Sequence, residues 1–428
     1  MSDAVGSSGA HGVSGIFRRF GWGLGDQVLS SATNFILGAL VARAVTPRDF
    51  GAFSLAYATY TLSLGASRAV VGDPMAVRFS SVPADHWREG VRMGTGTALT
   101  IGSIVGLGCI GAALLLGGSL TIVLVILGVS LPALLVQDTW RYALFARGRA
   151  SAAFLNDLTW ALSMFVAFGL LMNAGLTTVA GFTGAWAGGG TVAAVVGLFQ
   201  LRIVPSGPSS ALRWFSAQRD LAPRYLAEFA LSTGASSLIV FGIGSLTGLA
   251  QVGQLRAGQI ALGPLNVLFV GAAMTTVPEG VRLLRDSPRR LEHASRWLSV
   301  TMAGGAFLWG VLILTLPAGA GRFALGANWE GARSLVFPLS IGVVGYGLSF
   351  GATTGLRSLA AARRSLRAKY VDASSSVVIV LAGASLGGAQ GAAWGYAVSG
   401  CLRIVNWWWQ FTRAMREYEA NLVSRPID

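Results

Sequence analysis

The chain has 428 residues, of which 53% are hydrophobic and only 12% are charged. Soluble domains carry about 25% charged residues, so this composition leaves too little charge to cover a water-exposed surface and excludes a soluble enzyme. The formal net charge is +14, but the basic residues lie between apolar runs and not along one face, which argues against a nucleic-acid partner. We therefore expect a polytopic membrane protein.

Apolar runs long enough to cross a bilayer recur along the whole chain. A membrane-spanning helix needs about 20 mostly apolar residues, and the sequence offers twelve such runs. In chain order they lie near 21–44, 50–72, 91–116, 119–145, 152–173, 177–200, 223–248, 256–281, 295–317, 333–356, 371–388 and 391–412. A signal peptide is the alternative interpretation of residues 16–44, but that run is longer than a signal-peptide core.

The basic residues predict how these spans are oriented. If the N-terminus is cytoplasmic, the two tails and the even-numbered connections hold 25 of the 32 basic residues. Cytoplasmic loops of membrane proteins carry an excess of Lys and Arg. We therefore expect both termini in the cytoplasm.

The two halves of the chain resemble each other. Matches that keep their order at a nearly constant offset are Asp26 with Glu228, Asp157 with Asp372, and Ala185-Trp186-Ala187 with Ala393-Trp394-Gly395. Six spans per half give both halves the same topology, which relates them by an axis along the membrane normal. The predicted fold class is an all-α integral membrane protein whose 12 transmembrane helices form two six-helix lobes related by a pseudo-two-fold along that normal. Such lobes leave a cleft near the midplane, which is typical of an alternating-access transporter.

The repeat also predicts the domain organisation. In chain order we expect a disordered cytoplasmic tail (1–19), an N-lobe (20–204), a cytoplasmic linker (205–222), a C-lobe (223–412) and a second cytoplasmic tail (413–428).

Residues for catalysis or metal binding do not form any known motif in the sequence. The two cysteines, Cys109 and Cys401, fall within apolar runs, and the three histidines fall outside them. No catalytic triad or phosphate-binding loop is present. We expect neither an enzyme nor a metal or cofactor site.

Ionisable residues within the spans are the candidate functional groups, because each is costly in lipid and should face a cavity or a partner. Asp26 in the first span and Arg68 in the second lie at similar depths and could pair. Asp138 and Arg141 lie three positions apart on one face of the fourth span, where a local ion pair could form. Glu228 is the repeat mate of Asp26.

Two interpretations of these groups remain open. In the functional one, the arginines attract an anionic headgroup while Asp26 or Glu228 takes protons or cations. In the structural one, ion pairs hold helices together. On the opposite side of the membrane, Arg43 and Arg256 are candidates for phosphate contacts, with interfacial anchoring as the alternative.

Four segments carry a resemblance to a known family. They are Ala42-Arg43-Ala44-Val45-Thr46-Pro47-Arg48-Asp49-Phe50-Gly51, the run from Gln137 to Arg149, Gly263-Pro264-Leu265-Asn266-Val267, and Gly326-x-x-Trp329-x-x-Ala332. These segments resemble bacterial polysaccharide and lipid-linked-oligosaccharide flippases (O-antigen-flippase-like) of the multidrug/oligosaccharidyl-lipid/polysaccharide exporter superfamily. The resemblance extends from about residue 20 to residue 412.

The resemblance implies an ATP-independent flippase of the bacterial plasma (inner) membrane that moves an undecaprenyl-(pyro)phosphate-linked oligosaccharide between leaflets. It assigns Arg68, Arg141 and Arg256 to the pyrophosphate. Its members are usually driven by a cation gradient, so Asp26, Asp138 and Glu228 become candidates for coupling to H⁺ or Na⁺.

The implied partners are the lipid-linked glycan, the lipid bilayer, and a glycan polymerase or export machinery. Two alternatives remain: a cation-coupled multidrug-type antiporter of the same superfamily, and a non-transporting scaffold for envelope assembly.

Overall fold

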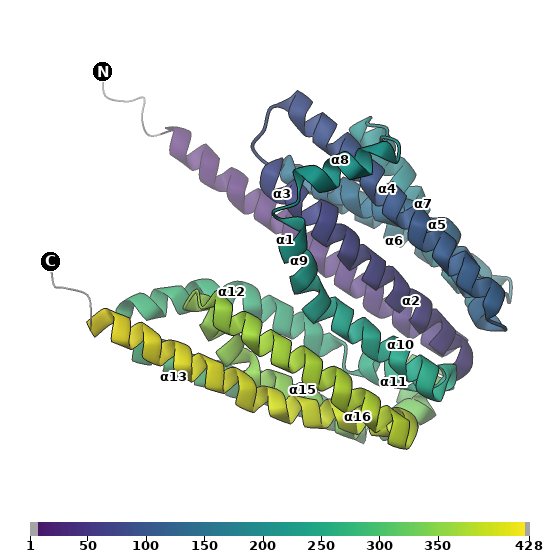
Figure 1. Cartoon of the computed structure of the whole chain (residues 1–428). Helices are drawn as coiled ribbons and strands as arrows, with labels where there is room; N and C mark the ends of the chain where they lie inside the picture. Colours follow the sequence, from purple (N-terminus) through teal and green to yellow (C-terminus); the bar gives the residue numbers. More distant parts are fainter. Residues whose placement is uncertain (1–6, 424–428) are drawn as a thin grey trace. The chain divides into compact units, whose positions relative to one another are not determined.

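The computed structural model describes the backbone of residues 7–423, all of whose regular elements are helices (Figure 1). It contains two compact units. The first unit comprises Met1–Leu37 and Ala56–Thr233, and the second comprises Gly38–Leu55 and Gly234–Asp428. Residues 38–55 therefore pack with the second unit although they precede most of the first along the chain.

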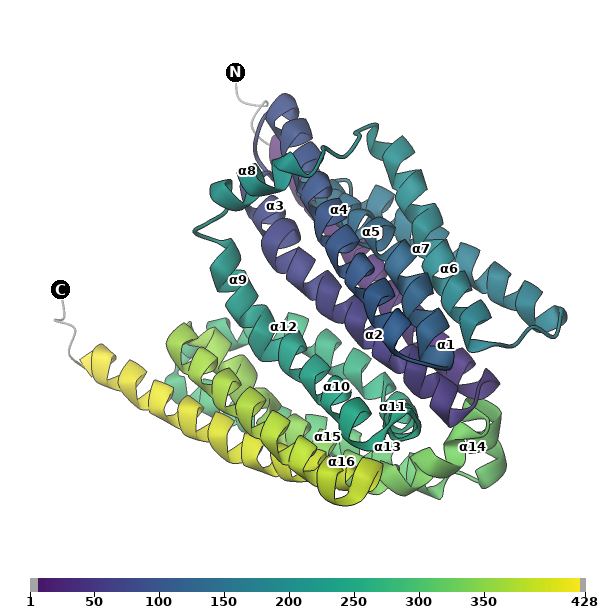
Figure 2. The ribbon, with the colours of Figure 1, turned by 45° about the vertical axis from the view of Figure 1, so that its right-hand side comes forward.

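The first unit is built from the N-terminal part of the helix series. Its elements are most of α1 (Ser7–Ala44), the end of α2 (Pro47–Ser67), the π-helix η1 (Arg68–Gly72), α3 (Asp73–Arg78), α4 (Ala84–Leu115), α5 (Ser119–Ala146), α6 (Ala150–Asn173), α7 (Val179–Leu201), α8 (Ser209–Ala217) and α9 (Ala222–Phe229). Helices α4 to α7 lie side by side in both views of the ribbon (Figures 1 and 2). The short helix α8 packs against α4.

The second unit contains the remaining helices and the turn between α1 and α2. A second π-helix, η2 (Ala230–Gly234), belongs to the first unit except for its last residue. It leads into the helices of the second unit, which are α10 (Ala235–Thr247), α11 (Leu249–Ala261), α12 (Pro264–Asp286), α13 (Pro288–Thr315), α14 (Ala318–Leu325), α15 (Asn328–Ser358) and α16 (Ala362–Val423). Helices α13, α15 and α16 form its largest packed layer. The α1–α2 turn is held by Asn328, whose Nδ2 donates to the carbonyls of Ala42 at 2.6 Å and Val45 at 3.0 Å.

Nine helices of the described part of the chain are long and apolar enough to cross a membrane. One of them, α16, is two helices joined at a kink at Gly387 and Gly388. Helix α1 covers the first predicted span, and α2 together with η1 covers the second. The predicted span near 256–281 differs, since it begins in α11 and continues in α12 across the two residues between these helices. The long apolar helices confirm the prediction of an all-α integral membrane protein that crosses the bilayer many times.

The start of α1 differs from the sequence prediction. The helix begins at Ser7, so residues 7–19 are helical where we expected a disordered tail, whereas residues 1–6 lie outside the described part. No proline occurs between residues 7 and 44 to interrupt the i→i+4 hydrogen bonds of the helix. A helix that is already nucleated extends at little further cost.

Close approach of helix backbones holds each unit together. A Cβ atom on Gly106 of α4 would lie 2.3 Å from the carbonyl oxygen of Gly128 on α5. In the second unit, a Cβ on Gly345 of α15 would lie 2.6 Å from the carbonyl oxygen of Gly400 on α16. Lipid is as apolar as the helix surfaces, so the hydrophobic effect does not drive spanning helices together. They associate through close packing, which small residues such as these glycines allow.

Candidate functional site

A cluster of five ionisable side chains lies within the first unit. Asp26 comes from α1, Arg68 from η1, Asp138 and Arg141 from α5, and Asp157 from α6. All five residues belong to predicted spans, where a charged side chain requires a partner. The cluster joins four elements, of which only α5 and α6 follow each other in the chain.

Arg68 and Asp138 form a two-point ion pair. Nε of Arg68 donates to Oδ2 of Asp138 at 2.9 Å, and Nη2 donates to Oδ1 at 2.6 Å. The Asp138 side chain is 8% exposed, whereas that of Arg68 is 35% exposed. The parallel geometry matches the guanidinium fork to a planar acceptor, which is the strongest arrangement of such a pair. The acid is buried, and the arginine keeps an exposed edge.

Arg141 contacts three acids and lies deeper. Its Nε is 2.9 Å from Oδ2 of Asp26 and 3.1 Å from Oδ2 of Asp157, and its Nη2 also donates to Asp26. Asp138 is more distant, at 3.9 Å from Nη1. The Asp26 side chain is 1% exposed, and its Oδ1 is buried without a hydrogen-bond partner among the residues that the structure describes.

Amide side chains fix the orientation of Asp157. Gln137 donates through Nε2 to Oδ1 of Asp157 at 2.9 Å and to Oδ1 of Asn156 at 3.0 Å. Asn156 in turn donates to the carbonyl of Ala193 at 2.9 Å and to Gln200 at 3.1 Å. This network ties α5, α6 and α7 together around the acid, so Asp157 has little freedom to move.

The charges of the cluster do not cancel. With every member ionised, two guanidinium groups face three carboxylates, which leaves one negative charge in a largely buried site. Buried uncompensated charge is costly. The excess negative charge attracts a cation to the cluster and repels an added anion.

The ion pairs differ from those that the sequence suggested. The sequence suggested that Asp26 could pair with Arg68 and that Asp138 could pair locally with Arg141. The local pair is present at 3.9 Å, but Asp26 pairs with Arg141 and not with Arg68, whose partner is Asp138. Asp138 is engaged by the fork of Arg68, so Arg141 turns to the acids of α1 and α6. Asp157 was missed as a site residue, although its match with Asp372 in the repeat was a usable signal.

The other candidate residues lie elsewhere. Glu228 is exposed on α9, in contrast to its buried repeat mate Asp26. Arg43 and Arg256 belong to the second unit. The guanidinium of Arg43 lies 4.4 Å from the centre of the Phe323 ring, which gives it a cation–π contact.

The second unit contains its own buried ion pair. Nη1 of Arg403 contacts Asp372, and its Nε donates to Oγ of Ser349 at 3.0 Å. Asp372 is the repeat mate of Asp157, so both halves place an acid at this position and meet it with an arginine from another segment. Asp372 and Arg403 line a mainly apolar cavity of about 450 Å³. No group of three or more His, Cys, Asp or Glu side chains suited to a metal ion occurs among the described residues.

No protein-family model and no curated protein matches the sequence. Solved structures do match its fold. An inward-facing multidrug resistance MATE family transporter of the MOP superfamily aligns with a TM-score of 0.69 at 14% identity, covering 90% of this chain and 95% of that one. The lipid II flippase MurJ, in an inward closed conformation, aligns with a TM-score of 0.67 at 11% identity, covering 94% and 93%.

A third similar structure is a MOP superfamily transporter from Pyrococcus furiosus, described as having a binding pocket of reverse polarity. It aligns with a TM-score of 0.53 at 14% identity, covering 94% of this chain and 95% of that one. These alignments span nearly the whole chain at identities that support the fold alone. The chain therefore has the fold of the MOP-superfamily transporters, the superfamily that its sequence resemblance implied.

Proposed function

We propose that this chain is an alternating-access flippase or exporter of the bacterial plasma membrane, and not an enzyme. Its substrate is an undecaprenyl-(pyro)phosphate-linked oligosaccharide or a related polysaccharide precursor. The fold shared with a lipid II flippase supports this class of substrate. The resemblance of the α1–α2 turn and of α5 to oligosaccharide flippases supports it independently.

The observation that carries the proposal is that Arg68 remains partly exposed although it is ion-paired. Its guanidinium is paired with a buried acid, yet 35% of its side chain is exposed. A phosphate group accepts the same two parallel hydrogen bonds from a guanidinium as a carboxylate does. Arg68 can therefore exchange Asp138 for a substrate phosphate without changing its own geometry.

Neutralisation of an acid makes this exchange favourable. While Asp138 is ionised, the cluster already carries excess negative charge, and an arriving pyrophosphate is repelled. When the cluster takes up a proton or a cation, the electrostatic attraction between its acids and Arg68 weakens. The phosphate then replaces Asp138 as the partner of Arg68. Release of that proton or cation returns Arg68 to Asp138 and expels the phosphate. This cycle couples transport to an H⁺ or Na⁺ gradient through Asp138 and Asp26.

Arg141 has a structural role, because it holds the acids of two helices together. Its side chain is 14% exposed and holds acids from α1 and α6, so its loss strands two buried carboxylates. We assign it to holding the cluster together, and Arg68 to the phosphate.

A cation-coupled multidrug antiporter is the second candidate. The net negative charge of the cluster favours it, as does Oδ1 of Asp26, which has no hydrogen-bond partner in the described part of the chain. The fold shared with a MATE family transporter also favours it. Such a protein would export organic cations that carry no phosphate.

Reconstitution separates the two candidates. Proteoliposomes would carry either a fluorescent undecaprenyl-diphosphate-linked oligosaccharide, the same oligosaccharide on a neutral polyprenol, or ethidium as the organic cation. We expect the diphosphate probe alone to be moved. Arg68→Ala should slow it about tenfold or more, because a hydrogen bond to a charged group is worth about 1.5–3 kcal/mol.

Movement of ethidium without the diphosphate lipid would establish the antiporter instead. Equal movement of the neutral and the diphosphate lipids would exclude a phosphate contact at Arg68. If the folded protein moves none of the probes, the result would favour the third alternative, a non-transporting scaffold for envelope assembly.

A further inference from the structure

Arg68 is the first residue of a π-helical segment. The backbone N–H of Asp73 donates to the carbonyl of Arg68, which is the i→i+5 bond of a π-helix, and α2 and α3 continue on either side. A π-turn holds one extra residue compared with the α-helix and frequently marks a functional site. If such a turn moves along a helix, each residue that it passes rotates by about 100° around the axis. The direction of Arg68 therefore depends on where the π-turn is held.

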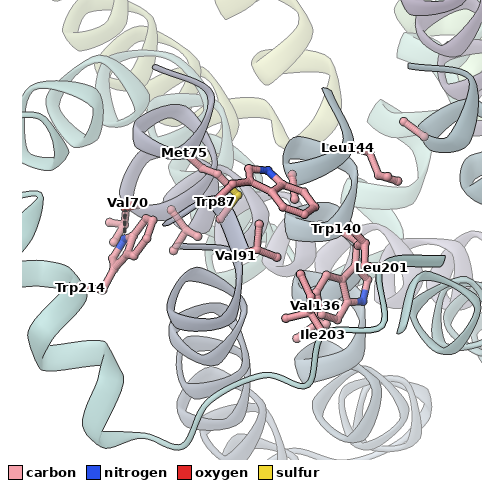
Figure 3. Packing of buried hydrophobic residues seen from close by; sticks show 13 residues of the cluster. Val70, Met75, Trp87, Val91, Val136, Trp140, Leu144, Leu201, Ile203 and Trp214 are labelled. Carbon is pink, nitrogen blue, oxygen red and sulfur yellow. Dashed lines mark hydrogen bonds between the residues drawn. The ribbon is translucent and has the colours of Figure 1, made fainter. Parts of the chain in front are cut away.

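A tryptophan from another segment holds this π-turn. Nε1 of Trp214, on α8, donates to the carbonyl oxygen of Val70 at 2.9 Å, in the middle of η1. Figure 3 shows the Trp214 ring lying directly against Val70, with the hydrogen bond drawn between them. Trp214 is fully buried, and its ring stacks on Phe79 with centroids 5.8 Å apart. The indole thus fixes a backbone group two residues from Arg68.

The chain on either side of α8 is tied to α3, which follows η1, and to α4. Arg78 at the end of α3 donates through Nη2 to both carboxylate oxygens of Asp220, at 2.7 and 2.6 Å. Before α8, the backbone N–H of Ser206 donates to the carbonyl of Arg92 on α4 at 3.1 Å. A Cβ on Gly96 of α4 would lie 2.4 Å from the carbonyl oxygen of Ser206, so the linker fits a groove that only glycine leaves open. The contacts on both sides of α8 seat Trp214 against η1.

We propose that α8 is a clamp on the π-turn and that Trp214 is the positioning residue through which it keeps Arg68 directed at Asp138. The inference rests on the proposed function, because it gives the linker control over the arginine that receives the phosphate. With Trp214 seated, η1 holds the Arg68–Asp138 pair. With Trp214 withdrawn, the carbonyl of Val70 loses the indole donor, the π-turn is free to move, and Arg68 turns away from Asp138.

The test compares two tryptophans that make the same kind of bond. Trp214→Phe removes the indole donor and retains a ring. Trp309→Phe is the matched control, since Nε1 of Trp309 donates to the carbonyl of Ala261 at 3.0 Å in the second unit, where no π-turn is involved. Each full-length variant would be measured for thermal stability, for hydrogen exchange of the amides of residues 68–73, and for movement of the diphosphate probe.

We expect Trp214→Phe to lose more thermal stability than Trp309→Phe, because Trp214 is fully buried and Trp309 is partly exposed. Exchange and transport are therefore compared at a temperature where both variants remain folded. Only Trp214→Phe should speed exchange at residues 68–73, and only Trp214→Phe should slow the probe towards the level of Arg68→Ala. Hydrogen exchange reports on η1 whatever the substrate is.

Two results would overturn the clamp. One is unchanged exchange at residues 68–73 in Trp214→Phe, and the other is transport by Trp214→Phe equal to that of Trp309→Phe while Arg68→Ala is impaired. Failure of the proposed function gives a different pattern, in which Arg68→Ala itself moves the probe at the wild-type rate.

Discussion

At the scale of single residues, the two arginines of the cluster have different tasks because they differ in burial. Arg68 retains an exposed edge and one acid partner, whereas Arg141 is enclosed by Asp26 and Asp157. Removing one partner of a buried ion pair costs about 3–5 kcal/mol, because the other charge stays behind without compensation. An exposed pair contributes about 0–1 kcal/mol.

Arg141→Ala should therefore reduce the thermal stability and membrane abundance of the protein strongly. The measurement is the apparent melting temperature of detergent-solubilised protein, followed by fluorescence-detected gel filtration. Arg290→Ala is the control, since Arg290 pairs with Asp286 on an exposed face and its loss should change little. Neutralising Asp26 and Asp157 together with Arg141 should recover part of the lost stability. Equal melting temperatures for Arg141→Ala and Arg290→Ala would exclude the structural role.

The sequence identified four of the five cluster residues, and the local pair of Asp138 with Arg141 is present, but Asp26 meets Arg141 and not Arg68. Ionisable residues inside apolar runs are conspicuous, so Asp26, Arg68, Asp138 and Arg141 could be found from hydropathy alone. Which acid meets which arginine depends on how η1, α1, α5 and α6 are rotated against one another. The π-turn at Arg68 leaves no pattern in hydropathy, so the direction of that side chain could not be predicted.

At the scale of elements, the kink in α16 is the clearest case of a backbone that requires glycine. Gly388 has φ 57° and ψ −138°, a conformation that residues with a side chain rarely adopt. The next backbone N–H, of Ala389, donates to Oε1 of Gln251 at 2.8 Å. A Cβ on Gly388 would lie 2.9 Å from that same oxygen, whereas a Cβ on Gly387 would have nothing within 4 Å.

Gly388→Ala should destabilise the protein by about 1–3 kcal/mol, the usual cost of a strained backbone conformation. Gly387→Ala is the neighbouring control, because its φ of −148° is open to any residue. Thermal unfolding of the two variants beside the parent protein makes the comparison. A melting temperature for Gly388→Ala at or above that of Gly387→Ala would show that the kink is not needed.

Helix positions were more predictable than the segments between them. The apolar runs predicted spans near 119–145 and 152–173, and the helices are Ser119–Ala146 and Ala150–Asn173. Polar extensions and connecting helices were not predicted, since α4 begins at Ala84 and α8 occupies the linker. These segments are helical because of packing and local hydrogen bonding, which an apolar-run criterion does not measure.

At the scale of the whole molecule, the repeat in the sequence does not coincide with the compact units. Residues 38–55 belong to the first predicted lobe by chain order, yet they pack in the second unit. Their partners are Gly326, Asn328 and Leu249, all far along the chain. The resemblance in this turn was visible in the sequence, but its packing partners depend on tertiary structure and could not be predicted.

The arrangement of basic residues makes a topology prediction that can be checked across the full chain. In a variant lacking Cys109 and Cys401, single cysteines introduced at exposed positions near residues 72, 150, 210 and 290 should all react from the cytoplasmic side. The reason is the excess of Lys and Arg that holds such connections inside. The assay is labelling of intact cells with a membrane-impermeant maleimide, which should fail at all four positions until the cells are opened. Labelling of any one of them in intact cells would contradict both the span order and the cytoplasmic termini.

The central claim is that Arg68 exchanges Asp138 for the phosphate of the substrate, and binding affinity tests it most directly. Purified protein would be titrated with undecaprenyl diphosphate, with Arg290→Ala as a control that should bind like the parent. Arg68→Ala should weaken binding about tenfold or more through loss of a charged hydrogen-bonded contact. Asp138→Asn should tighten binding, because it removes the acid that competes for the same guanidinium. Weaker binding in both variants, or no change in either, would contradict the exchange.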